Sequence, residues 1–258
     1  QVKEYLKKIS DMKQYLPIRP ETVDGTKIEV CLNVGSAEKS ELELEEYTDG
    51  VGLFRTEFLY MSKKQLHTEE EQFEVYKKIA EVYGERPVVI RTLDIGGDKK
   101  LDYLELPQED NPFLGLRALR LCFEMKPIFK TQLRAILRAG VYGNIWIMFP
   151  MVGSIGDIRF AKQIVEEVKQ ELDQEEVPYD KNIKVGIMVE IPSIALMADV
   201  AASEVDFASI GTNDLCQYLM AVDRLNPSVA KYYQSFHPAM FRLIKQIAEA
   251  FTSQGKPV

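Results

Sequence analysis

The chain has 258 residues, of which 46% are hydrophobic and 28% are charged, and its 32 basic and 40 acidic side chains give a formal net charge of −8 at pH 7. A chain of this length buries a full core, as one large α/β domain or as two small ones. The acidic balance argues against a general nucleic-acid binder, which needs a basic face for phosphates, and no apolar run reaches the roughly 18 residues of a membrane span.

Residues 1–15 predict a polar helix or linker that does not resemble a signal peptide. It is expected to end at the dipeptides Leu16-Pro17 and Arg19-Pro20. From residue 27 onward, short apolar runs alternate with longer amphipathic segments. The apolar runs predict strands at 27–33, 50–54, 87–90, 144–149, 184–189 and 206–210. The amphipathic segments predict helices at 68–83, 112–137 with a break at Pro127, 154–172, 194–202, 215–222 and 238–251.

The segment 68–83 carries the clearest helix signal. Its apolar side chains share one face, Thr68 and Glu71 form a capping-box pattern, and Gly84 is a plausible stop. The segment 36–48 also has helix-forming composition, but its run of glutamates predicts a solvated face.

The predicted strands are continuously apolar rather than alternating, which indicates strands that are buried on both faces of a parallel sheet. Six strand-then-helix units fit either an open doubly wound sheet or most of a (β/α)8 barrel. We favour an α/β fold of the TIM type, a (β/α)8 barrel represented here by about six of its eight units.

The last residues, 255–258, resemble 85–88, which lead into a predicted strand, so a seventh strand is expected to start there. A barrel open after six strands exposes two unpaired edges, which favours aggregation. Either further residues follow Val258 or a partner covers the open edges. We expect the former, and mass spectrometry showing a chain that ends at Val258 would contradict it.

Charged and amide side chains follow four of the predicted strands at their carboxyl ends. They are Arg55, Glu57, Arg91, Asp94, Asp98, Lys99, Glu190, Asn213, Asp214 and, further along, Arg224. Because parallel strands all point the same way, these groups are expected to meet at one mouth. Converging arginines need an anion, and oxygen ligands from Glu190 and Asp214 suit Mg²⁺. Together they indicate phosphoryl transfer.

Each of these residues also has a simpler explanation. A single arginine after a strand is often a surface ion-pair partner, Glu190 or Asp214 could cap the next helix, and 95–98 could be a turn. The coincidence at four strand ends favours a shared pocket. His67 and His237 lack any partnering motif and are expected to be structural or exposed.

Six motifs, in order, resemble the phosphoenolpyruvate-binding domain of enzyme I, the phosphoenolpyruvate–protein phosphotransferase family of the bacterial sugar phosphotransferase system. They are VGLFRTEFLYM (51–61), VVIRTLDIGGDK (88–99), NPFLGLRALR (111–120), IMFPMV (147–152), GIMVEIPS (186–193) and DFASIGTNDLCQYLMAVDR (206–224). By this resemblance, residues 1–20 correspond to the linker helix from an N-terminal phosphohistidine domain. Residues 21–258 correspond to the barrel domain, shortened at its C-terminal end.

The resemblance implies a (β/α)8 barrel and assigns a role to each matching residue. Glu190 and Asp214 would bind Mg²⁺, and Asn213 would contact the substrate beside the metal. The phosphate and carboxylate of phosphoenolpyruvate would be bound by Arg55, Arg91 and Arg224, with help from Lys99 and Arg117.

The family transfers the phosphoryl group to a histidine of its N-terminal domain and then to a small histidine-containing phosphocarrier protein, which drives sugar uptake. The resemblance thus implies a cytoplasmic homodimer whose interface lies in this domain, with no membrane insertion and no nucleic-acid partner. The phosphoacceptor histidine and the cysteine that protonates enolpyruvate both lie outside this chain. None of Cys31, Cys122 and Cys216 takes that role, so the chain is expected to bind ligand without turnover.

Other functions stay open. A pyruvate phosphate dikinase or phosphoenolpyruvate synthase barrel would have the same pocket with different relay domains. An aldolase or pyruvate-kinase-like barrel would need a strand-end lysine, for which only Lys99 is placed. A non-enzymatic dimerisation or sensing module is a further alternative. The family also usually has Asp-Arg-Gly where this chain has Asp223-Arg224-Leu225.

Overall fold

The computed structural model describes residues 7–8, 10–97, 99, 101–104 and 106–258. Asp98, predicted among the strand-end carboxylates, lies outside the described residues, as does much of the predicted N-terminal helix. Residues 7–8 and 10–12 are helical and lead into the 3-10 helix η1 (Lys13–Tyr15). The role of this segment as a linker stays a prediction.

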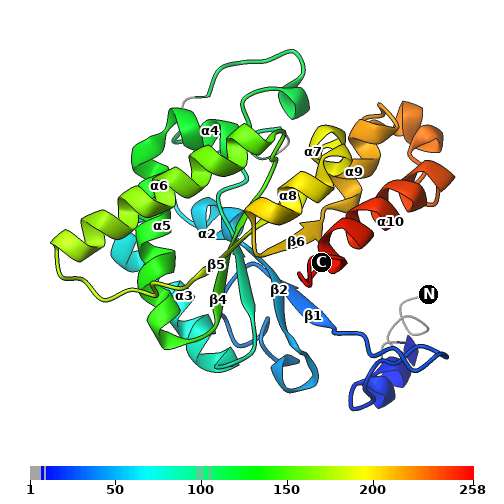
Figure 1. The fold of residues 1–258 in the computed structure, drawn as a ribbon, viewed down its shortest axis with the longest axis horizontal. Coiled ribbons are helices and arrows are strands. Elements are labelled where there is room, and N and C mark those ends of the chain that lie inside the picture. Colours follow the sequence, from blue (N-terminus) through cyan, green and yellow to red (C-terminus); the bar gives the residue numbers. More distant parts are fainter. Residues whose placement is uncertain (1–6, 9, 98, 100, 105) are drawn as a thin grey trace.

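The sheet has six parallel strands, and each strand pairs with the next in chain order (Figure 1). Their bounds are β1 (Cys31–Val34), β2 (Gly50–Arg55), β3 (Val88–Arg91), β4 (Ile145–Phe149), β5 (Lys184–Val189) and β6 (Phe207–Ile210). This singly wound order is that of a barrel, because a doubly wound sheet reverses direction near its middle. The predicted α/β class and the incomplete (β/α)8 barrel are confirmed, with β1 and β6 at the two edges.

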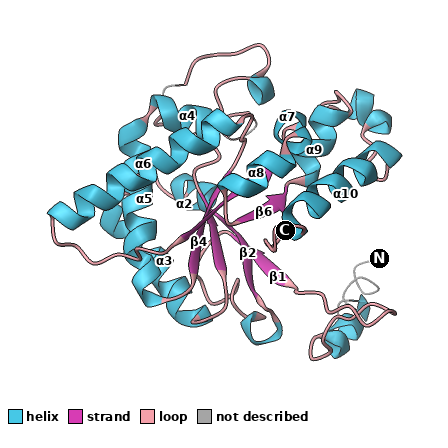
Figure 2. Ribbon diagram, viewed as in Figure 1, coloured by secondary structure: helices cyan, strands magenta, loops and turns pink. Residues whose placement is uncertain are grey.

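The helices lie outside the sheet, as Figure 2 shows. They are α2 (Thr56–Met61), α3 (Glu69–Tyr83), α4 (Leu119–Glu124), α5 (Lys126–Ala139), α6 (Ile155–Gln174), α7 (Pro192–Leu196), α8 (Ala198–Glu204), α9 (Thr212–Leu219) and α10 (Pro238–Thr252). Short 3-10 helices join them at η2 (Glu45–Tyr47), η3 (Pro112–Leu114), η4 (Gly140–Tyr142) and η5 (Pro227–Tyr232). None of the helices in the described residues is both long enough and apolar enough to cross a bilayer.

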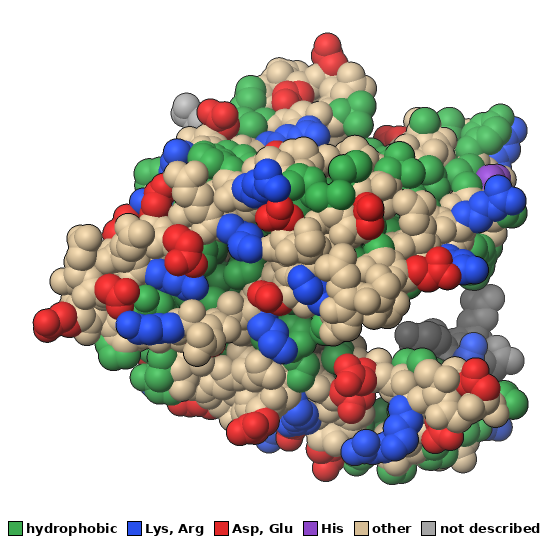
Figure 3. All heavy atoms as spheres, viewed as in Figure 1, with side chains coloured by type: hydrophobic (Ala, Val, Ile, Leu, Met, Phe, Trp, Pro, Cys, Tyr) green, Lys and Arg blue, Asp and Glu red, His purple; other side chains and the backbone are tan. Residues whose placement is uncertain are grey.

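Ion pairs join the outer helices α3, α5 and α6. Arg134 of α5 pairs with Glu69 at the start of α3 and with Glu175 just after α6, and Lys130 pairs with Glu171 of α6. Charges of both signs are interspersed over the face drawn in Figure 3. On this face, charged side chains of the two signs therefore lie close to one another.

Alternation along the strands explains how the site is positioned. Successive side chains point to opposite faces of a strand. Val89, Met148, Met188 and Phe207 form a small apolar cluster of their own, with Leu53 and Trp146 packed against it. Two residues further along their strands come Arg55, Arg91 and Glu190, so the charged side chains continue the same inner face at the carboxyl ends.

Most local predictions are confirmed. Thr68 and Glu71 form the capping box of α3, and α3 ends at Gly84, whose φ is 57°. The helix predicted over 112–137 is only partly confirmed: residues 115–118 are not helical, and the break lies at Met125, between α4 and α5, while Pro127 is in the first turn of α5. The carbonyl of Pro257 accepts the N–H of Ala208 at 3.0 Å, as the carbonyl of Pro87 accepts that of Val51 at 2.8 Å, so the likeness of 255–258 to 85–88 extends to pairing with the sheet.

Two predictions about the start of the barrel are wrong. The segment 36–48 forms turns and the short η2 instead of an α-helix, because like charges recur at helical spacing and Glu41 accepts the N–H of Ser36 instead. The first strand starts at Cys31 rather than 27, since Lys27 makes an isolated antiparallel bridge with Glu21. The helix α2 was not predicted.

Candidate functional site

A cavity of about 560 Å³ lies at the carboxyl ends of the strands. All eight residues predicted for the site line it: Arg55, Arg91, Lys99, Arg117, Glu190, Asn213, Asp214 and Arg224. Glu57 and Asp94 also line it. The structure thus brings the predicted residues together, while their individual roles stay predictions.

Arg55 and Arg91 are directly opposite each other on the paired strands β2 and β3. Neighbouring strands are only about 4.8 Å apart, so two guanidinium groups in this register repel each other. Arg55 packs its guanidinium over the ring of Phe58, 4.5 Å from the centroid, and forms no ion pair with a described carboxylate. This pair of arginines therefore creates a strongly cationic position at the rim.

Two buried carboxylates, those of Glu57 and Asp94, form ion pairs with the cations of the site. One oxygen of Glu57 lies 2.7 Å from Arg91 and 2.9 Å from Lys99. Asp94 lies 3.0 Å from Arg91, 2.8 Å from Lys99 and 3.1 Å from Arg117. The contact of Glu57 was not predicted from the sequence; the only signal was its position two residues after Arg55.

The charges in this cluster shift one another's pKa. Burial acts to raise the pKa of Asp94, but the nearby charges of Arg91, Arg117 and Lys99 hold it well below its usual range. Burial acts to lower the pKa of Arg117, and the charges of Asp94 and Asp214 outweigh it and raise that pKa. These groups therefore stay charged at neutral pH.

Arg117 is fully buried at 1% exposure and connects Asp94, which follows β3, with Asp214, which follows β6. Its guanidinium contacts Asp94 on one side and Asp214, at 2.9 Å, on the other. The hydroxyl of Tyr218 also accepts from it at 3.3 Å. Ala118, the next residue, has a φ of 52°, and this left-handed backbone turns the chain directly after the arginine.

Glu190 and Asp214 follow the paired strands β5 and β6. Burial, and then the negative charge of Asp94, raises the pKa of Glu190 to about 7, and Asp214 adds to this. One Glu190 oxygen accepts the N–H of Met151 at 2.6 Å, from a backbone held at φ 52°. Met151 thus stores local strain where it orients a site carboxylate.

This donor set fits a Mg²⁺ ion. Oδ1 of Asp214 is buried without a hydrogen-bond partner in the described residues, 3.5 Å from Nε of Arg224, and Glu190 lines the same cavity with its charge opposed by burial. The described residues contain no group of three or more His, Cys, Asp or Glu that could hold a metal. Two carboxylates with room for water and substrate oxygens are what Mg²⁺ prefers.

Other buried polar atoms without a partner also gather here. Among the described residues they include Nε of Arg55, Nε of Arg91, Nε of Arg224 and Oε2 of Glu57. Buried polar atoms are normally hydrogen-bonded, and a cluster of exceptions indicates a ligand or ordered water that completes them.

Asn213 and Arg224 lie at the opposite rim. Asn213 is exposed in the first turn of α9, and its side-chain oxygen accepts from the Tyr233 hydroxyl at 3.3 Å. The N–H of Arg224 donates to the side chain of Gln217 at 2.9 Å, and its guanidinium lies 3.5 Å from Asp214. Leu225 does not have a positive φ, so the leucine in place of the family's usual glycine causes no backbone strain.

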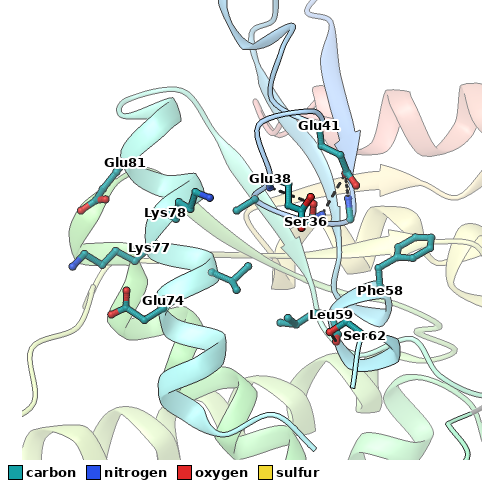
Figure 4. Close-up of a pocket in the computed structure, with 13 residues that line it drawn as sticks. Ser36, Glu38, Glu41, Phe58, Leu59, Ser62, Glu74, Lys77, Lys78 and Glu81 are labelled. Atoms are coloured by element: carbon teal, nitrogen blue, oxygen red, sulfur yellow. Dashed lines mark hydrogen bonds between the residues drawn. The ribbon is translucent and has the colours of Figure 1, made fainter. Parts of the chain in front are cut away.

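A second cavity of about 630 Å³ lies on the outside of the barrel (Figure 4). Glu74, Lys77, Lys78 and Glu81 of α3 form one wall, and the loop after β1 and the helix α2 form the others. Its charged side chains are largely solvent-exposed and of both signs. It lacks the buried, unpaired polar atoms of the strand-end cavity, which is therefore the better candidate.

The family model described as "PEP-utilising enzyme, PEP-binding domain" matches residues 10–258. A phosphoenolpyruvate-protein phosphotransferase of Priestia megaterium is 51% identical over 253 residues, which are 98% of this chain and 44% of that protein. The protein of the same name from Geobacillus stearothermophilus is 53% identical over 235 residues, 91% of this chain and 41% of that protein. The chain thus spans less than half the length of these relatives.

Among solved structures, a citrate lyase from Burkholderia xenovorans LB400 superposes with a TM-score of 0.52 at 17% identity. The match covers 93% of this chain and 65% of the lyase chain. At this identity the likeness concerns the fold alone.

Proposed function

The chain belongs to the PEP-utilising enzymes, as their PEP-binding domain, and we propose that its strand-end cavity binds phosphoenolpyruvate together with Mg²⁺ for phosphoryl transfer. The family predicted from the six sequence motifs is confirmed. One observation carries the proposal: five cationic side chains and two candidate metal-binding carboxylates, from four strand ends, line one cavity of about 560 Å³.

In this proposal Arg55, Arg91 and Arg224 bind the phosphate and carboxylate groups of the substrate. Within the described residues their Nε atoms form no hydrogen bond, although that of Arg224 lies 3.5 Å from Oδ1 of Asp214, and arginine favours bidentate contact with an anion. Lys99 lines the cavity and assists these arginines, and Asn213 contacts the substrate beside the metal. Arg117 acts mainly through Asp94 and Asp214, because its guanidinium already contacts both.

Glu190 and Asp214 would hold Mg²⁺, which when bound supplies positive charge next to the phosphoryl oxygens. The cations of the chain hold the phosphate and carboxylate in a fixed orientation. They also offset the negative charge that develops as the P–O bond breaks. The apolar inner cluster below the charged rim helps to exclude water from the transferring group.

The names of the curated relatives favour a phosphotransferase over the dikinase or synthase alternative. We propose that the phosphoryl group passes to a histidine of another domain and on to a histidine-containing phosphocarrier protein, in the cytoplasm, for sugar uptake. Residues 1–20 would be the linker to that domain. We also propose a homodimer, and sedimentation with and without phosphoenolpyruvate and Mg²⁺ would test whether ligand strengthens it.

Calorimetry on the 258-residue chain tests the ligand. We expect phosphoenolpyruvate to bind in the presence of Mg²⁺ and Arg91→Ala to abolish this binding, because Arg91 is one of the two facing arginines. Glu190→Ala should lose the Mg²⁺-dependent part of the affinity while the fold survives. Arg159→Ala, which removes an exposed arginine of α6, serves as the control. An unchanged affinity in Arg91→Ala would refute the proposed site.

A further inference from the structure

Glu57 is a buried carboxylate that the proposed chemistry does not use. It lies in the first turn of α2, two residues after Arg55, and its side chain is 2% exposed. A buried carboxylate is costly unless charged partners compensate it. Its partners come from a different strand, since Arg91 ends β3 and Lys99 follows in the loop beyond. Glu57 therefore ties the end of β2 to the cations of β3.

Asp94 contacts the same two cations, but it belongs to the same segment of the chain as they do. It lies three residues after Arg91 and five before Lys99, within one connected segment, and it also holds Arg117. Among the described residues, Glu57 is the one carboxylate that pairs with these cations from the neighbouring strand. This matters because Arg55 and Arg91 are register partners whose charges repel each other.

The contacts of Glu57 anchor both cations without using all their donors. Among the described residues, Nη2 of Arg91 contacts Glu57 at 2.7 Å and Asp94 at 3.0 Å, Nη1 contacts the sulfur of Met188 at 3.6 Å, and Nε forms no hydrogen bond. The ammonium of Lys99 uses two of its three donors on the same carboxylates. Arg91 and Lys99 both line the cavity, so Glu57 anchors side chains that an anion bound there would meet.

We propose that Glu57 is a positioning residue, which sets the orientation of Arg91 and Lys99 so that they receive the phosphate and carboxylate of one ligand together. The inference rests on the proposed function. Phosphoenolpyruvate carries two anionic groups at a fixed separation, so its affinity depends on the spacing of the cations. Inorganic phosphate is a single compact ion around which loosened cations can rearrange.

Two variants separate positioning from charge compensation. Glu57→Asp keeps the charge but shortens the side chain by one methylene, so the carboxylate no longer reaches both cations. Glu57→Gln keeps the length and an acceptor oxygen but removes the charge. The matched controls are Glu74→Asp and Glu74→Gln, on the exposed wall of the outer cavity (Figure 4). The fluorescence of Trp146, the single tryptophan, and thermal melting report on folding.

Calorimetry with phosphoenolpyruvate plus Mg²⁺, and separately with inorganic phosphate, provides the readout. We expect Glu57→Asp to weaken phosphoenolpyruvate binding about tenfold or more, because small misplacements of binding groups are costly. Phosphate affinity should change much less, and Glu57→Gln should lose less than Glu57→Asp. Equal losses for both ligands, a larger loss in Glu57→Gln, or wild-type affinity in Glu57→Asp would each overturn the inference. If the wild-type chain itself binds no phosphoenolpyruvate, the proposed function fails first.

Discussion

At the scale of single residues, the site depends on close contacts that leave little room for change. Glu190 lies against Gly211, where an added Cβ would be 2.7 Å from Oε2 of the carboxylate. The φ of Gly211 is −78°, so the constraint on this position is steric rather than conformational. Buried polar groups held this tightly keep their geometry only while their neighbours stay small.

We expect Gly211→Ala to lower Mg²⁺-dependent phosphoenolpyruvate affinity by about tenfold or more, because the methyl group displaces Glu190. The control is Gly156→Ala in α6, whose new Cβ would meet nothing closer than Oγ of Ser154 at 3.4 Å. Calorimetry on both variants checks this. Wild-type affinity in Gly211→Ala would show that Glu190 does not act through this geometry.

The free energy of unfolding should depend on pH through His67, which does not line the cavity at the strand ends. Burial, and then the positive charge of Lys63, lowers its pKa below the usual 6.5, and Glu71 opposes this weakly. The unfolded chain therefore binds a proton at a higher pH than the folded chain does. By linkage, this histidine costs stability as the pH falls through 6.5, and the cost is absent above it.

The prediction compares wild type with His67→Gln, which does not titrate. The free energy of unfolding of wild type should fall relative to the variant between pH 8 and about pH 5. Urea unfolding at both pH values measures the difference. A constant gap between the two proteins would contradict a buried, neutral histidine.

At the scale of elements, the helices are held by specific ends as well as by packing. The long helix α6 begins with a capping box of Ser154 and Asp157. It ends in a Schellman-type arrangement, in which Val177 donates to the carbonyl of Leu172 at 2.9 Å and Glu176 donates to that of Asp173 at 3.2 Å. Glu176 has a φ of 55° there, a conformation that favours glycine.

Glu176→Gly should therefore stabilise the protein by roughly 0.5–1 kcal/mol, because glycine relieves the left-handed strain at the end of α6. Gln170→Gly, at an exposed position inside the same helix, should destabilise it by roughly 1 kcal/mol. Urea denaturation of the two variants provides the comparison. If both changes destabilise to the same extent, the backbone argument is wrong.

At the scale of the whole molecule, the sheet joins distant segments at one rim. The cavity draws on the ends of β2, β3, β5 and β6, and the ligand would contact all of them at once. A ligand that binds only the folded state stabilises it by mass action. The benefit extends to the whole barrel because these strands lie in one continuous sheet.

Phosphoenolpyruvate and Mg²⁺ together, at a concentration near one hundred times the dissociation constant, should raise the melting temperature by roughly 5–10 °C. Phosphoenolpyruvate alone or Mg²⁺ alone should raise the melting temperature less, because in the proposed site the substrate oxygens and the metal bind each other. Scanning calorimetry measures the shift, and Arg91→Ala should show none. A full shift with Mg²⁺ alone would place the metal at a site unrelated to the substrate.

The sequence alone determined the features that depend on short-range patterns. The continuous apolar runs predicted six parallel strands, and Thr68 with Glu71 predicted the start of α3. Pro127 predicted a helix break two residues after its observed place at Met125. The site residues were found because charged and amide side chains directly follow the apolar runs, at the carboxyl ends of the predicted strands. These residues lie at one rim because the strands are parallel, and the continuous apolar runs had already predicted parallel strands.

Only the tertiary structure decided which charges neutralise one another. Glu57 meets Arg91 across 34 residues, and Arg117 reaches Asp214 across 97. No local pattern encodes such pairs, since they depend on how neighbouring strands are registered and on which side chains lose their water. Likewise, the segment 36–48 has the composition of a helix, but its glutamates repel one another at helical spacing. Local preference sets what a segment tends to form, and burial in the shared core decides which charges must find a partner.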